Sequence, residues 1–451
     1  MDQSVERIEN AQAVPVAPNI LIIVTDDQSV GTMRRDVMPK TRFYLRRQGR
    51  TYTNFFVTAP ICCPSRATIM TGRYNHNNGV TGNTRERFRL DFDSTLQHYL
   101  SEAGYQTWIS GKFLNAWSIR YAGRPPAWDR YTITRGGSHH NTWFRHGQGD
   151  GPGRRFMYRP YADQLIERQA LRYVRRTEES DAQPWFGFLS LTIPHGPPIA
   201  MDHYGDLRFA ARPPNRAERE RSIADKWPGY AEHGIQGNPH FISKAWIVQL
   251  QMLRHADDVI GRVMAQLGDQ NELENTIVVF LSDNGYMFGA HRLKGKRLPY
   301  TESIKVPALI RWTKHIQPGS VDMRFTANVD LAPTLLHAAG VTPDPAFPLD
   351  GRDLFDPSWE RDYILTEHWK EASRTTGRWR PGWASLRSRD WQYIEYFSNG
   401  RTVFREYYDL RRDPAQLQNR LARRQTDAGP RIAKLHALLT QARTCVAEAC
   451  P

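Results

Sequence analysis

The sequence predicts an α/β fold: a mixed, largely parallel sheet flanked by helices, followed by a smaller C-terminal α+β domain with an antiparallel sheet. Three apolar runs, at residues 19–25, 185–193 and 276–282, are typical of strands buried on both faces of a parallel sheet. Stretches with helical periodicity, at 161–176 and 246–267, lie between these runs along the chain. Apolar strands that alternate with helices indicate an α/β domain.

The C-terminal part has a different pattern. A Pro-rich stretch at 343–348 is typical of a linker, and short aromatic segments such as 391–397 follow it. We therefore expect an N-terminal arm over 1–18, a main domain over 19–342 that carries the functional site, and a C-terminal subdomain over 343–451.

Composition restricts the class of protein. The formal charge of +14 suits an anionic substrate or polyanion, although an Arg-rich composition with solvated charges explains it equally well. The arginines are scattered, and no zinc-finger or RNA-binding signature is visible, so nucleic acid is not expected as a partner. No run of about 18 apolar residues occurs, so no membrane span is expected.

The four cysteines fall into two pairs. The spacing of Cys445 and Cys450 permits a small-loop disulfide, which is typical of an oxidising compartment. The first 18 residues lack the apolar core of a signal peptide. The compartment stays open: a secreted or periplasmic location with the leader removed is slightly favoured over a cytoplasmic one.

Acidic and amide side chains follow two of the predicted strands. Asp26 and Asp27 end the first strand, and Asp283 and Asn284 end the run at 276–282. The carboxyl ends of strands are where α/β sheets place their sites, and adjacent carboxylates repel each other unless a cation neutralises them. The oxygen-only set favours Ca²⁺, with Mg²⁺ as the runner-up; a solvated turn is the alternative for Asp26 and Asp27.

The stretch at 60–72 carries a second candidate group. Pro64 favours the first turn of a helix, and Gly72 is a natural stop. Cys62 then lies at a helix N-terminus, which favours anions, and Arg66 lies one turn on. A thiol, a helix N-terminus and an Arg form a site for an oxyanion; a buried structural pair of Cys62 and Cys63 is the alternative.

This stretch, C-C-P-S-R at 62–66 followed by T-G at 71–72, resembles the signature of the formylglycine-dependent sulfatases. The resemblance implies an alkaline-phosphatase-like fold and oxidation of Cys62 to Cα-formylglycine by a maturation enzyme. The aldehyde hydrate is then the nucleophile, and Cys63 occupies a variable position. The strand-end acids, G-K at 111–112, P-H at 194–195 and S-D-N-G at 282–285 extend the resemblance over roughly residues 19–420.

The resemblance assigns roles to these residues. It implies a metal site formed by Asp26, Asp27, Asp283, Asn284 and the converted Cys62. It implies that Arg66, Lys112 and Lys296 neutralise the sulfate, that Asp283 is the base and that His195 protonates the departing alcohol. Lys294 competes with Lys296, and the sequence leaves that choice open.

The substrate class is also indicated by resemblance. Many sulfatases have K-x-H where this chain has K-F-L-N at 112–115, a form similar to glucosamine-6-sulfatases and heparan sulfate endosulfatases. This implies a 6-O-sulfated amino sugar or glycosaminoglycan as substrate. A phosphonate or phosphate ester hydrolase of the same fold and a non-catalytic binder of sulfated glycans are the alternatives. Four further candidate substrate contacts are Asn115, His140, His291 and His368.

Overall fold

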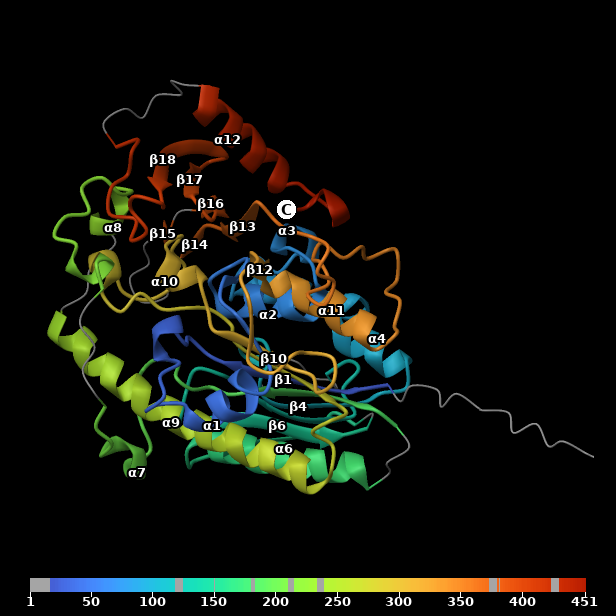
Figure 1. Ribbon diagram of the computed structural model, residues 1–451. Coiled ribbons are helices and arrows are strands. Elements are labelled where there is room, and N and C mark those ends of the chain that lie inside the picture. The colour runs from blue at the N-terminus through green and yellow to red at the C-terminus, as the bar shows by residue number, and fades with distance from the viewer. Residues whose placement is uncertain are drawn as a thin grey trace, which may run out of the picture.

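The fold is a central sheet between two layers of helices, with a second, smaller sheet beside it (Figure 1). The computed structural model describes residues 17–117, 125–149, 151–179, 183–209, 215–232, 239–372, 379–380, 382–422 and 430–451. Apart from its last two residues, the expected N-terminal arm over 1–18 lies outside the described residues.

Ten described strands form the central sheet, in the order β11-β2-β10-β9-β1-β8-β4-β5-β6-β7. The five strands from β9 to β5 are parallel to one another, and antiparallel pairs extend the sheet on both sides. This confirms the mixed, largely parallel sheet. The strands are β1 (Asn19–Thr25), β2 (Arg50–Tyr52), β4 (Gln106–Lys112), β5 (Arg130–Thr134), β6 (Thr142–Gln148), β7 (Arg154–Tyr158), β8 (Trp185–Ser190), β9 (Thr276–Ser282), β10 (Ala308–Arg311) and β11 (Ser320–Asp322).

Helices cover both faces of this sheet. Figure 1 shows α2, α4 and α11 on one side and α1, α6 and α9 on the other. The longer helices are α2 (Cys62–Thr71), α4 (Leu96–Glu102), α6 (Ala162–Glu178), α9 (Pro239–Asp269), α11 (Leu331–Ala338) and α12 (Pro430–Ala442). The short ones are α1 (Pro39–Thr41), α3 (Asn75–Asn78), α7 (Asp202–Gly205), α8 (Gly229–Glu232) and α10 (Thr301–Ile304). Single turns are η1 (Val30–Thr32), η2 (Arg42–Arg46), η3 (Arg85–Arg89), η4 (Phe92–Ser94), η5 (Ala217–Arg219), η6 (Ala290–Arg292), η7 (Asn328–Asp330) and η8 (Ala447–Ala449).

The position of β1 at the centre of the sheet explains why its sequence is apolar. Ile20 and Ile22 pack into the core on the α2 side, whereas Leu21 and Ile23 pack into the core on the α9 side. Because alternate side chains point to opposite faces and both faces are covered, the strand has to be apolar throughout. Its partners β8 and β9 run parallel to it, so their carboxyl ends lie at the same edge of the sheet.

Two sequence expectations are corrected. The stretch at 118–160, whose content of Gly, Arg, His and aromatic residues predicts a long excursion over the edge of the sheet, includes the strands β5, β6 and β7. These strands extend the sheet beyond β4, and β6 and β7 pair as an antiparallel hairpin. The amphipathic pattern over 90–103 predicts a helix, but α4 begins only at Leu96. Asp91 instead caps the 3-10 turn η4 through Asp93, and Thr95 is extended, so the helix cannot start earlier.

The sequence favours a solvated Asp257 on the helix expected at 246–267, and this prediction is wrong. Its carboxylate is fully buried and accepts hydrogen bonds from the backbone N–H groups of Lys40 and Thr41. It thereby satisfies free donors at the start of α1. Sequence periodicity could not reveal this partner, because Asp257 and Lys40 are far apart in the chain.

The second sheet is antiparallel and has the order β13-β16-β17-β18. Its strands are β13 (Tyr363–His368), β16 (Gly382–Ser388), β17 (Trp391–Ser398) and β18 (Arg401–Asp409), and α12 packs against it. Two-stranded ladders join β12 (Thr326–Ala327) to β3 (Phe55–Phe56) and β14 (Glu371–Ala372) to β15 (Trp379–Arg380). The buried core of this sheet includes Phe56, Tyr74 and Ile304 from the first 342 residues. The boundary at 342/343 therefore stays a prediction.

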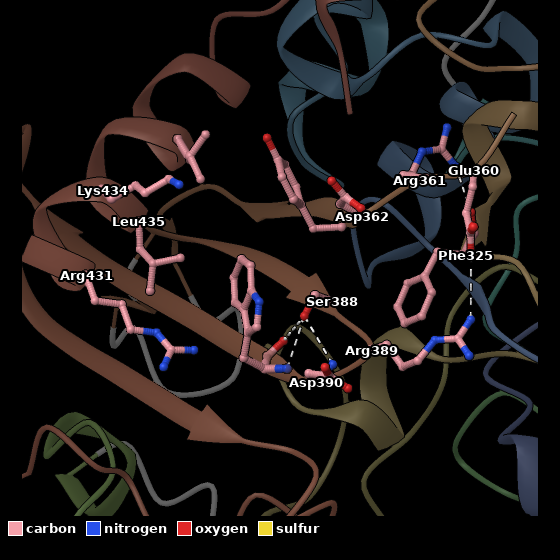
Figure 2. Close-up of a pocket in the computed structure, with 13 residues that line it drawn as sticks. Phe325, Glu360, Arg361, Asp362, Ser388, Arg389, Asp390, Arg431, Lys434 and Leu435 are labelled. Carbon is pink, nitrogen blue, oxygen red and sulfur yellow. Dashed lines mark hydrogen bonds and ion pairs between the residues drawn. The ribbon is translucent and has the colours of Figure 1, made fainter.

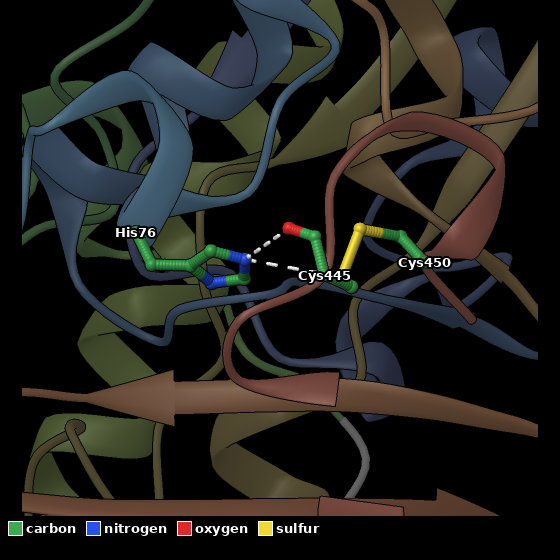
Figure 3. Close-up of side chains that lie close together, drawn as sticks. All are labelled: His76, Cys445 and Cys450. Carbon is green, nitrogen blue, oxygen red and sulfur yellow. Dashed lines mark hydrogen bonds between the residues drawn. A yellow bond between two sulfur atoms is a disulfide. The ribbon is translucent and has the colours of Figure 1, made fainter. Parts of the chain in front are cut away.

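The C-terminal segment docks on α3. The disulfide that the spacing of Cys445 and Cys450 permits is present, with an S–S distance of 2.01 Å. Figure 3 shows His76 of α3 beside it; its Nε2 lies 3.0 Å from the Cys445 carbonyl oxygen, and its Nδ1 lies 2.8 Å from a Glu367 carboxylate oxygen. Both ring nitrogens thus face acceptors, so this cluster of a His and two Cys is a clasp rather than a metal site.

Within the described ranges, none of the helices combines the length and the apolar character that a membrane span requires.

Candidate active site

Helix α2 presents the cysteine of the candidate site. Ile61 before it is extended, the helix runs over Cys62–Thr71, and Gly72 ends it in the left-handed conformation at φ 63°. This conformation and the nearby Pro333, which a Cβ at this position would meet at 2.8 Å, both require glycine. Cys62 and Arg66 are both buried and lie one helical turn apart, as the sequence predicts.

The ends of β1 and β9 bring the acids together. The backbone N–H of Asp27 donates to Asp283 Oδ1 at 3.2 Å, and the Asn284 amide donates to Asp27 Oδ1 at 2.6 Å. Asp27 has a positive φ of 72°, an uncommon conformation that concentrates at functional sites. Asp26, Asp27, Cys62 and His195 each offer a ligand atom, and these atoms lie within 4.8 Å of one another.

Two lysines approach the acids from different elements. The Lys112 ammonium, at the end of β4, donates to Asp26, and the Lys296 ammonium donates to Asp27. Lys296 Nζ also lies 2.9 Å from the sulfur of Cys62. Lys294 is exposed. The structure therefore brings Lys296, and not Lys294, to the cysteine.

Arg66 connects the helix to the sheet. Its Nε donates to Asp283 Oδ2 at 2.8 Å, and its Nη1 donates to the Lys112 carbonyl at 2.7 Å and contacts Ser190 Oγ at 2.5 Å. Ser190 was missed by sequence reasoning, although its position at the end of the β8 strand is a signal that could have identified it. Close approach of β8 also explains Gly111, where a Cβ would meet the Ser190 carbonyl oxygen at 1.8 Å.

The electrostatics of the site stabilise its charged forms. Burial raises the pKa of the Asp26 carboxyl, but Lys112, His195 and Lys296 together outweigh burial and leave that pKa at about 2. Burial likewise raises the pKa of the Cys62 thiol, but Lys112 and Lys296 together lower it below its usual value. For Cys63, burial dominates and raises the pKa to about 12. The two neighbouring thiols therefore differ, and only Cys62 faces the cations.

His195 lies just after β8 with Nε2 3.8 Å from Asp27 Oδ2. Burial lowers the pKa of its imidazole, but Asp26 and Asp27 outweigh burial and leave it raised. The His195 carbonyl accepts a hydrogen bond of 2.7 Å from His139 Nε2. His139 is buried and also lies 3.4 Å from Thr192 Oγ1. The sequence alone favours solvent-exposed loop positions for both His139 and His140, and no local pattern distinguishes the two.

The four further predicted substrate contacts lie in different surroundings. Asn115 donates its backbone N–H to Cys63 Sγ at 3.2 Å, next to the cysteine loop. His140 is exposed and packs against Tyr161. His291 is buried with Nδ1 2.6 Å from Glu220, and burial lowers its pKa to about 4. His368, at the end of β13, is buried near Trp383.

The described residues fit both a cation and an oxyanion. Asp26, Asp27, Asp283 and Asn284 offer only oxygen ligands, which a hard divalent cation prefers. Two buried donors, Arg66 Nη2 and His195 Nδ1, have no hydrogen-bond partner within the described part of the chain. Such buried donors cost free energy unless an acceptor satisfies them, and an oxyanion beside Cys62 supplies one.

Comparison with models of protein families identifies the family to which the chain belongs. Residues 18–341 match the sulfatase family. The chain belongs to the sulfatase family. Residues 289–444 match the family described as N-sulphoglucosamine sulphohydrolase, C-terminal. The resemblance drawn from the C-C-P-S-R stretch is therefore confirmed at the level of the family.

Individual relatives agree with this membership. The extracellular sulfatase Sulf-1 homologue of Caenorhabditis elegans is 32% identical over 361 residues, covering 75% of this chain and 48% of that protein. The chain thus spans about half the length of this relative. The human N-acetylglucosamine-6-sulfatase is 28% identical, with 89% of this chain and 80% of that protein covered.

A solved structure shares the fold. It was determined in complex with its substrate D-glucosamine-2-N,6-O-disulfate and superposes with a TM-score of 0.75 at 22% identity, covering 95% of this chain and 98% of that one. This likeness confirms the alkaline-phosphatase-like α/β fold.

Proposed function

We propose that the protein hydrolyses sulfate esters, using a formylglycine formed from Cys62 and one divalent cation. The position of Cys62 carries this proposal: at a buried helix N-terminus, its sulfur lies 3.8 Å from Asp26 Oδ1 and 2.9 Å from Lys296 Nζ. Membership of the sulfatase family supports the same chemistry. Formation of the formylglycine requires a maturation enzyme as a partner.

Asp26, Asp27, Asp283 and Asn284 would hold the cation together with the converted Cys62. The oxygen-only side chains favour Ca²⁺, with Mg²⁺ as the runner-up. When bound, the cation supplies Lewis-acid stabilisation of negative charge, and the formylglycine supplies the nucleophilic hydroxyl.

The surrounding side chains would bind the sulfate and transfer the protons of the reaction. Arg66, Lys112 and Lys296 bind the sulfate oxygens and stabilise the charge that develops on them in the transition state. Asp283 accepts the proton of the nucleophile. His195, whose Nε2 lies 3.8 Å from Asp27 Oδ2, holds the proton that the departing alcohol takes up when the S–O bond breaks.

The substrate class we propose is a 6-O-sulfated amino sugar or glycosaminoglycan. The K-F-L-N sequence at 112–115 supports it, as do the names of the human relative and of the sugar bound in the solved structure of the same fold. The net charge of +14 supports attraction of a polyanion at low salt. Asn115, beside the cysteine loop, is the substrate contact we favour among the four candidates.

The test uses protein in which conversion of Cys62 has been verified by mass spectrometry. Sulfate release is measured from oligosaccharides that contain glucosamine-6-sulfate and from an aryl sulfate whose aryl group is uncharged. Hydrolysis of a matched aryl phosphonate ester is measured in parallel. We expect turnover of the two sulfates, with the sugar preferred. Turnover of the aryl sulfate alone would support sulfatase activity and contradict the proposed sugar substrate. Faster turnover of the phosphonate would instead indicate a phosphonate ester hydrolase. Binding of the sulfated sugar without any turnover would indicate a glycan-binding protein.

A further inference from the structure

A groove of about 660 Å³ lies at the edge of the central sheet, away from the candidate active site. Four arginines line it: Arg35, Arg42, Arg46 and Arg47. Its other lining residues are Pro39, Phe43, Thr51, Gly319 and Val321, from the α1–η2 segment and the region of β2 and β11. Among these described lining residues none is acidic. We refer to this feature as the arginine groove.

The charges of the arginine groove are concentrated and not neutralised within it. Arg35, Arg46 and Arg47 are exposed. Burial lowers the pKa of Arg42 and the neighbouring guanidinium groups of Arg46 and Arg35 lower it further, which is the mark of like charges held together. Repulsion of this kind costs free energy that an anion in the groove recovers.

The neighbouring acids are engaged outside the groove. Asp36 pairs with Arg34 at 2.5 Å, and Asp258 pairs with Lys40 at 2.8 Å. Neither carboxylate lines the groove. The positive charge of the arginines is therefore exposed at the surface of the groove, where a ligand would bind.

A second hollow has a lining of different charge, which sets the arginine groove apart from it. The hollow in Figure 2 lies between α12 and the C-terminal sheet and measures about 560 Å³. Its lining carries charges of both signs: Arg389 lies 3.8 Å from Glu360, and Arg361 is locked to the buried Asp330 at 2.8 Å. Mixed charges do not select an anion, whereas the arginine groove offers charge of one sign.

The shape and composition of the groove narrow the ligand further. Guanidinium groups bind the oxygens of sulfate and phosphate through paired hydrogen bonds. Phe43 and Val321 are large apolar side chains with exposed fractions of 46% and 57%, so they offer apolar surface between the charges. A chain that alternates sulfate groups with the apolar faces of sugar rings matches both features.

The groove is separate from the catalytic site. Figure 1 shows α1, which begins this segment, on the α9 side of the sheet, whereas α2 with Cys62 lies on the opposite side. No lining residue belongs to the candidate active site. We propose that the arginine groove is an exosite that binds the sulfate groups of a polysulfated glycan while another part of the same chain occupies the active site. This inference rests on the proposed function.

The test removes charge from the groove without touching catalysis. The variant Arg35→Gln/Arg46→Gln/Arg47→Gln spares Arg42, whose Nη1 donates to the Met33 carbonyl. The matched control Arg401→Gln/Arg411→Gln/Arg412→Gln loses the same charge from exposed positions on the C-terminal sheet and the turn that follows it. Both sets are made in the full chain, with Cys62→Ala for binding and with converted Cys62 for turnover.

Binding of a size-defined, highly sulfated glycosaminoglycan fragment is measured across a salt series. We expect the groove variant to bind about tenfold more weakly at low salt, since three exposed ion pairs each contribute a fraction of a kcal/mol to about 1 kcal/mol. The control set should bind as the parent does. Turnover of a monosaccharide sulfate should be equal in both sets.

Three results would overturn the exosite. They are equal weakening in the groove and control sets, tighter binding of duplex DNA than of the glycan, and tighter binding of anionic lipid vesicles than of the glycan. Retained turnover of the monosaccharide sulfate in the same preparation would show that the failure concerns the exosite alone. Loss of that turnover in the unmutated, converted protein would instead refute the proposed function.

Discussion

The ammonium group of Lys296 lies 2.9 Å from the sulfur of Cys62, although 234 residues separate them in the chain. The same ammonium pairs with Asp27. One side chain thus links the N-terminus of α2 to the end of β1, at the place where we propose that sulfate binds.

Lys296→Met should lower kcat/KM for an aryl sulfate by about 10² to 10³, because it removes a buried cation that we propose stabilises transition-state charge. Lys294→Met is the matched control, since Lys294 is exposed in the same loop, and it should stay near wild type. Initial rates of both variants decide the matter. A larger loss for Lys294 would show that the register of this loop is wrong.

Cys62→Ala should abolish turnover while the fold survives, because the change removes only a sulfur at the start of α2. Cys63→Ala should retain most activity and lose about 1 kcal/mol of stability through a small cavity. Mass spectrometry of the tryptic peptide should show a loss of about 18 Da, from oxidation of CH₂SH to CHO, at Cys62. A loss of this mass at Cys63 would refute the assignment.

Removal of divalent cations by a chelator should abolish turnover, and Ca²⁺ should restore it. Asp283→Asn should prevent this recovery, since Asp283 is both a proposed ligand and the proposed base. Activity is measured during titration with Ca²⁺ and, separately, with Mg²⁺. Near-normal turnover of the variant in saturating Ca²⁺ would contradict both roles of Asp283.

His139→Gln should lower kcat about tenfold with little change in KM, because His139 holds the main chain of His195, and small displacements of a catalytic group reduce the rate. His140→Gln is the control and should have no effect, since its ring is exposed. Steady-state kinetics of an aryl sulfate measure both. Equal effects of the two substitutions on kcat would contradict the proposal that His139 positions His195.

The His76 clasp should make folding stability depend on pH. Burial lowers the pKa of His76, but the hydrogen bond to Glu367, the charge of Glu367 and the hydrogen bond to the Cys445 carbonyl together outweigh burial and leave the pKa raised. A raised pKa means that the folded state binds the proton more tightly than the unfolded state. The stabilisation is therefore complete below the unfolded pKa of about 6.5 and is lost as the pH rises through the folded value.

The measurement compares denaturant unfolding of the wild type and His76→Gln at about pH 5.5 and about pH 8.5, on either side of the titration of histidine. The free energy of unfolding of the wild type should exceed that of the variant by a larger amount at the lower pH. A difference that is independent of pH, or larger at the higher pH, would show that His76 is neutral in the folded state.

The sequence by itself determined the local chemistry. Consecutive apolar residues at 20–24 predict a strand buried on both faces, and the acids after it mark the end where sites form. The start of α2 at Cys62 and its end at Gly72 follow from local signals for helix termini. The C-C-P-S-R stretch then indicates the family. These features depend on neighbours a few residues away, so the sequence displays them directly.

Only the tertiary structure decided which side chains meet. It brought Lys296 and not Lys294 to Cys62, placed His139 and not His140 against His195, and buried Asp257 at the start of α1. Each of these choices depends on how strands and loops distant in the chain are aligned, such as the pairing of Val24 with Ser190. A shift of one residue turns a side chain to the opposite face of a strand. Such alignment results from packing of the whole core, which no local window of sequence contains.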